Sequence, residues 1–157
     1  MQKRKNMVKN IAMPINDKIG KGLILNTSYD EFVLGTKVTL YNKYFIDSIE
    51  FDEPGKWKCF SCIKGKSEIE LWCRNEIIEN ICCRQSCIFK GHELIKMRYN
   101  LFLELIQENP VDYEKVYVPG KQRGQNQHVY DFEQSGLQVW VWRDLIRTVV
   151  IGKVGTE

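Results

Sequence analysis

The six cysteines are the residues of this chain whose type and spacing could most directly support chemistry. Cys59 and Cys62 have the Cys-x-x-Cys spacing that many structural zinc sites use, and Cys83 and Cys87 could complete a tetrahedron of thiolates. Side chains alternate along a strand, however, so Cys59 and Cys62 should face opposite sides of the strand-like segment 56–63. We therefore expect buried thiols and no metal, with zinc as the alternative cofactor.

The two histidines, His92 and His128, offer a second kind of chemistry. Cys83 or Cys87 could act as a nucleophile if one of these imidazoles served as its base. No spacing in the sequence requires such a pair, and no glycine-rich phosphate loop joins a strand to a helix. A small enzyme with a Cys/His site is therefore an alternative, and we favour a protein without catalytic activity.

Aromatic and basic residues form the pattern that we interpret as a binding surface. Bases stack on exposed aromatic rings while cations contact phosphates, and Trp, Tyr and Arg also dominate the energetics of protein interfaces. The predicted binding residues are Trp140, Trp142, Arg143, Arg147, Lys121, Arg123, Lys56, Lys58 and Trp72. The same pattern would be purely structural if a helix covered the aromatic face of the sheet.

The charge of the chain is concentrated near its N-terminus. Residues 1–22 contain six Lys and Arg and one Asp, which leaves 17 basic and 19 acidic residues, a net charge of −2, in the rest. A basic segment of this kind can contact phosphate or an anionic partner. We expect residues 1–20 to be a flexible basic arm and residues 21–157 to be a single domain, because a chain of 157 residues fits one domain better than two.

The lack of long apolar segments in the sequence indicates the cellular compartment that we expect for this protein. No stretch of about 18 apolar residues could form a membrane-spanning helix, and residues 1–20 lack the apolar run of a signal peptide. We therefore expect a cytoplasmic protein without a membrane partner, in which the cysteines are reduced.

Hydrophobic periodicity predicts an α+β fold. Short alternating segments between residues 22 and 73 predict a β-meander or a small twisted, barrel-like sheet in the N-terminal half. Apolar residues at helical spacing predict one main amphipathic helix at about residues 92–108, which Asn109 and Pro110 end. After Pro110, alternation predicts strands again, including a hairpin from 129–132 to 137–142 and a last strand.

Taken together, these patterns favour a non-catalytic binding or inhibitor-type accessory module. It would act through its aromatic and basic surface on a protein or a nucleic-acid partner. A zinc-stabilised nucleic-acid-binding protein and a small Cys/His enzyme are the alternatives. Small accessory proteins of bacteria and phages share this character, which is an analogy and not a motif match.

Overall fold

The computed structural model describes residues 22–51, 56–65, 67–120 and 122–152. The predicted arm at residues 1–20 and the predicted binding residue Lys121 lie outside this part of the chain. No helix among the described residues has the length and apolar content that crossing a lipid bilayer requires.

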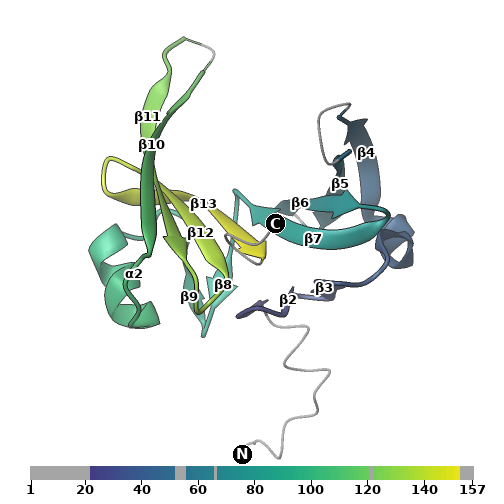
Figure 1. Cartoon of the computed structure of the whole chain (residues 1–157), viewed down its shortest axis with the longest axis horizontal. Coiled ribbons are helices and arrows are strands. Elements are labelled where there is room, and N and C mark those ends of the chain that lie inside the picture. The colour runs from purple at the N-terminus through teal and green to yellow at the C-terminus, as the bar shows by residue number, and fades with distance from the viewer. Residues whose placement is uncertain (1–21, 52–55, 66, 121, 153–157) are drawn as a thin grey trace, which may run out of the picture.

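One antiparallel sheet of eight strands organises the fold (Figure 1). Its strands are β4 (Phe45–Glu50), β5 (Lys58–Lys64), β6 (Ser67–Arg74), β7 (Ile77–Cys83), β10 (Asp112–Val118), β11 (Gln125–Phe132), β12 (Leu137–Trp142) and β13 (Leu145–Gly152). Neighbouring strands follow the order β10-β11-β12-β13-β7-β6-β5-β4. The chain thus forms two meanders, β4 to β7 and β10 to β13, which join where β13 pairs with β7.

The smaller elements cover one face of this sheet. They are β1 (Leu23–Ile24), β2 (Ser28–Tyr29), β3 (Phe32–Val33), the 3-10 helix η1 (Val38–Tyr44), β8 (Ile88–Phe89), β9 (His92–Glu93) and the helix α2 (Tyr99–Ile106). In Figure 1, β2 and β3 run below β6 and β7, and α2 lies beside the lower part of β10 to β12. The opposite face of the sheet curves upward between two raised ends, the hairpin β10–β11 and the strands β4 and β5.

Alternation along the strands decides which side chains enter the core. In β12, Leu137, Val139 and Val141 are buried, whereas Trp140 and Trp142 are only half-buried on the other face. Helix α2 contributes Phe102, which is fully buried and meets the Phe132 ring edge-on at 5.4 Å between ring centroids. The core therefore lies between the sheet and the small elements, and the side chains on the other sheet face are half-buried where β12 carries Trp140 and Trp142.

Helix α2 is shorter than the helix predicted for residues 92–108. It covers only Tyr99–Ile106 and ends at Gln107, whose φ of 53° is left-handed. The residues before it are held in other conformations by tertiary contacts: β9 pairs with β8, and the Lys96 N–H donates to the Ile146 carbonyl over 2.7 Å. The apolar spacing is helical there, but these long-range hydrogen bonds outweigh it.

The fold is rich in sheet. Of the meander predicted for residues 22–73, only β4 to β6 belong to the large sheet, whereas β1 to β3 form a separate three-stranded sheet and Val38–Tyr44 forms η1. The prediction of a barrel-like sheet is not confirmed. Within the described residues, β4 and β10 each pair with a neighbour on one side only, so the sheet is open at both ends.

Candidate functional site

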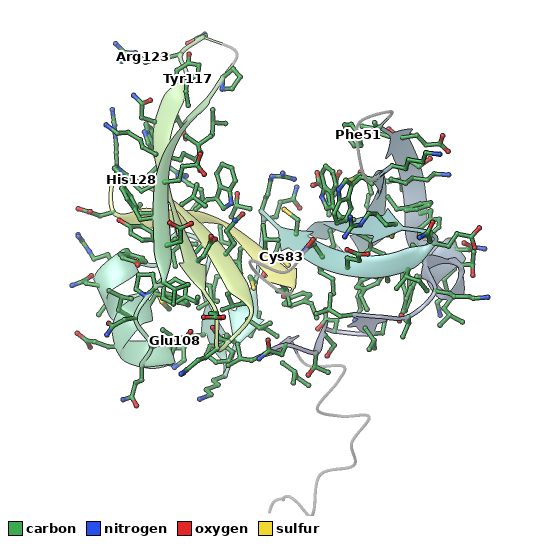
Figure 2. All side chains as sticks on the ribbon, viewed as in Figure 1. Phe51, Cys83, Glu108, Tyr117, Arg123 and His128 are labelled. Atoms are coloured by element: carbon green, nitrogen blue, oxygen red, sulfur yellow. The ribbon has the colours of Figure 1, made fainter. Side chains whose placement is uncertain are left out.

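A cleft of about 720 Å³ lies on the sheet face opposite the core. This volume falls within the usual range for ligand sites, which is roughly 300–1,000 Å³. The cleft draws its lining from both meanders, since Trp72 and Asn80 come from β6 and β7, and Gln127 and Trp140 come from β11 and β12. Figure 2 shows Tyr117, another lining residue, on the raised hairpin β10–β11 and Phe51 at the far side of the concavity.

Three of the four tryptophans, Trp57, Trp72 and Trp140, line this cleft. The Trp72 ring stacks on Phe51 at 5.4 Å between centroids and meets Trp57 edge-on at 6.5 Å. The Trp140 indole N–H donates to Gln138 Oε1 over 2.9 Å, which fixes the orientation of the ring. No other aromatic ring and no cation of the described chain lies over Trp140.

A β-bulge in β13 places two consecutive side chains in the cleft. The pairing with β12 shifts between Ile146 and Thr148, and Arg147 is the extra residue. As a result Arg147 and Thr148 both line the cleft, while Ile146 and Val149 on either side are buried in the core. Strict alternation would have sent one of the two cleft residues into the core.

A second bulge, in β7, positions Trp57. The pairing with β6 shifts between Ile78 and Asn80, which leaves Glu79 as the extra residue. The Glu79 carboxylate accepts from Arg74 over 2.8 Å, and the Arg74 guanidinium lies 4.4 Å from the centroid of the Trp57 ring. Glu79 of β7 thus holds Arg74 of β6, and Arg74 in turn holds the Trp57 ring at the cleft.

The two arginines of the cleft differ in their electrostatic surroundings. Arg84 forms an ion pair with Glu70, 2.5 Å from Nη1 to Oε2, and Glu70 also accepts from the Trp72 indole N–H over 3.2 Å. Arg147 forms no ion pair with any described residue. Because the described lining contains no carboxylate, an anionic group would meet cations and neutral groups there.

Two buried polar atoms of the cleft residues lack hydrogen-bond partners within the described chain. They are Oε1 of Gln127 and Nε of Arg147. Gln127 is only 7% exposed, and its amide nitrogen already donates to Gln125 Oε1 over 3.0 Å. Unpaired buried polar atoms cost roughly 1–3 kcal/mol each, so a ligand that supplies partners to them gains that energy.

The structure brings together only part of the predicted binding set. Trp72, Trp140 and Arg147 line the cleft. Trp142 lies outside the lining, packed between Arg143 and Arg147 with guanidinium-to-centroid distances of 4.4 and 5.0 Å.

The remaining predicted cations lie elsewhere. Lys56 and Lys58 line a separate hollow of about 640 Å³ beside η1 and β4, which shares Trp57 with the cleft. Arg123 is exposed at the end of the hairpin β10–β11 (Figure 2). The predicted surface is thus divided between the cleft, the adjoining hollow and the hairpin end.

Sequence reasoning did not select Arg84, Gln127 or Tyr117, although all three line the cleft. Tyr117 belongs to the alternation of β10, where exposed Tyr113 precedes it by four residues, and this spacing could have suggested it. Arg84 and Gln127 carry no comparable local signal, because only the long-range strand order brings them to the same face.

All six cysteines are buried, as expected for free thiols. Burial raises the pKa of the Cys59, Cys62, Cys73 and Cys82 thiols from 9.0 to about 12. The hydrogen bond with Cys87, followed by burial, also raises the pKa of Cys83. In the ranges that the structure describes, no group of three or more His, Cys, Asp or Glu residues is arranged to hold a metal ion.

The hydrogen bond that the structure shows for His128 does not involve Cys83 or Cys87. His128 Nδ1 is 2.6 Å from the Tyr113 hydroxyl, and the two rings stack. His92 is exposed on β9. Neither imidazole hydrogen-bonds a cysteine within the described chain, and the raised pKa of Cys83 is opposite to the lowered value that activates a thiol.

Comparisons with protein-family models, with curated proteins and with solved structures give no match to this chain. Function is therefore inferred from the cleft itself. Its aromatic rings can stack on flat groups, its arginines can bind anions, and its amide side chains can form hydrogen bonds.

Proposed function

We propose that this protein is a non-catalytic binding module that holds a macromolecular partner in the aromatic cleft. The observation that carries the proposal is the convergence of Trp57, Trp72 and Trp140 from separate strands on one concave face. Large aromatic side chains ordinarily gain free energy by burial in a core, so three of them around an open cleft are typical of a contact surface.

The contacts around the rings support this proposal. Glu70 and Gln138 hold the indole N–H groups of Trp72 and Trp140, so both rings keep their orientation without a ligand. A rigid, pre-oriented ring loses little conformational entropy on binding, which is why such rings become hot spots. The partner would be a protein segment or a nucleic acid, because both present flat groups and hydrogen-bonding edges.

The proposal is tested by affinity capture with the full-length protein, followed by identification of the captured component and titration of that purified component. Trp140→Leu should weaken binding of the purified partner by about tenfold or more, as expected for a central aromatic contact. Tyr113→Leu is the control, because Tyr113 is an exposed aromatic residue that lies outside the cleft lining. Equal affinities for the wild type and both variants would show that the cleft is not the binding surface.

A further inference from the structure

The free ring of Trp140 is the starting point for a more specific inference about the ligand. Its indole N–H is occupied by Gln138, and within the described chain no ring or cation covers its faces. A flat ligand group that enters the cleft meets the Trp140 ring among the lining residues. Stacking on an aromatic ring is a sequence-tolerant way of binding bases, since every base has a π-face.

Gln127 and Arg147 flank this ring on the two neighbouring strands. Val129 of β11 and Thr148 of β13 are the direct partners of Trp140. Gln127 lies two residues from Val129, and Arg147 lies next to Thr148 at the bulge. Their unpaired atoms are complementary, because Gln127 Oε1 accepts a hydrogen bond and Arg147 Nε donates one.

The ligand that fits both features is a flat ring with a donor and an acceptor on its edge. Every nucleobase carries donors and acceptors in the plane of its ring. A Phe or Trp ring does not carry both a donor and an acceptor on its edge, so an aromatic peptide would have to satisfy the two atoms with its backbone or with another side chain. The arginines add charge that suits phosphate, while Glu70 offsets the charge of Arg84.

We infer that the cleft binds single-stranded nucleic acid, with one base stacked on Trp140 and its edge between Gln127 and Arg147. This inference rests on the binding function proposed above and names the partner of the same cleft. A double helix is excluded because its bases are already stacked and paired.

The test uses fluorescein-labelled dodecamers and the anisotropy of each probe on titration with the full-length protein. The probes are oligothymidylate, oligouridylate, an abasic deoxyribose-phosphate strand of the same charge, and a double-stranded dodecamer. We expect the two base-bearing single strands to bind on the order of tenfold more tightly than the abasic strand and the duplex. The two single strands also show whether DNA or RNA is preferred, because only RNA carries the 2′-hydroxyl.

Variants test whether the preference for bases depends on Trp140 and Gln127. Trp140→Leu should abolish the preference for bases over the abasic strand, and Gln127→Leu should reduce it without lowering the stability of the fold. Tyr113→Leu, outside the cleft lining, should leave the preference for bases unchanged.

Glu70→Gln provides a variant that should gain affinity. It releases Arg84 from its ion pair, and the glutamine oxygen can still accept from the Trp72 indole N–H. Binding of the single strands should strengthen. The slope of log Kobs against log salt should steepen by about 0.7 for one added phosphate contact.

Two results would overturn the inference. One is equal binding of the base-bearing and abasic strands, and the other is failure of both single strands to bind. In either case, the Trp140→Leu variant can still bind the captured partner more weakly than the wild type does. The binding function proposed above then stands, and the partner is a peptide segment. If capture is also insensitive to Trp140→Leu, both proposals fail.

Discussion

The Arg147 guanidinium lies over the indole of Trp142, 5.0 Å from the ring centroid, while Arg143 lies 4.4 Å from the centroid of the same ring. The Trp142 ring therefore holds the guanidinium of Arg147, which is one of the residues that line the cleft. The bulge makes this possible, because Arg147 is the extra residue of β13 and is not paired across to β12.

This contact predicts an energetic coupling between Trp142 and Arg147. A double-mutant cycle with Trp142→Leu and Arg147→Met should give a coupling free energy of about 0.5–1 kcal/mol, the range for partly exposed cation–π pairs. Urea denaturation of the four proteins measures it. A parallel cycle with Trp140→Leu and Arg143→Met should give a value near zero, since no cation of the described chain lies over Trp140. Equal couplings in the two cycles would contradict the arrangement.

The buried thiols predict a loss of stability at alkaline pH. The pKa values of Cys59, Cys62, Cys73 and Cys82 are about 12 in the folded protein against 9.0 ordinarily, so above about pH 9 the unfolded chain releases protons that the folded chain retains. Their contribution to stability is complete below about pH 9 and is lost as the pH rises towards about 12. Burial also raises the pKa values of Tyr29 and Tyr99, which acts in the same direction.

Urea denaturation under reducing conditions, at a series of pH values from neutral to about pH 11, measures this decline. The variant Cys62→Ala should show a shallower decline, because it removes one of the groups responsible. Thiol-reactive reagents should label the native protein slowly at neutral pH and label all six cysteines after denaturation. A free energy of unfolding that is independent of pH across this range would contradict the prediction.

Two glycines with positive φ provide a matched test of backbone packing. Gly136 has φ +67°, and a Cβ there would lie 2.3 Å from Asn26 Oδ1 and 2.7 Å from the Gly152 carbonyl oxygen. Gly91 has φ +80° with nothing within 4 Å. Gly91→Ala should therefore cost only the strain of a left-handed residue, about 1–2 kcal/mol, and Gly136→Ala roughly 1–3 kcal/mol more. Equal losses in the free energy of unfolding would show that the turn at Gly136 is looser than its contacts imply.

The Tyr29 hydroxyl joins the N-terminal strands to the segment that follows β7. It accepts a hydrogen bond from the Ile88 N–H over 3.1 Å, and Tyr29 is 5% exposed. Tyr29→Phe should lower the free energy of unfolding by about 1–3 kcal/mol, because the amide loses its partner at a largely buried position. Hydrogen exchange at the Ile88 amide should become faster. Tyr117→Phe is the control, since that side chain is 62% exposed, and unchanged exchange at Ile88 in both variants would count against the bond.

Much of the sheet could be predicted because alternation is a local property. Ile69, Leu71 and Cys73 are buried in β6 and Trp72 lies on the opposite face, as their two-residue period indicates. The same property separates Cys59 from Cys62 on β5: both are buried, but only Cys62 belongs to the main core cluster. The helix was predicted too long because its apolar spacing does not reveal the hydrogen bond between Lys96 and Ile146.

The sequence by itself determined the alternation of side chains along the strands, because that period depends on neighbouring residues. Tertiary structure alone decided which residues share the cleft. The pairing of β13 with β7 brings the two meanders together, and the bulges at Glu79 and Arg147 shift which side chains face the cleft. Register and bulges depend on contacts between distant strands, and such contacts leave no period in the sequence.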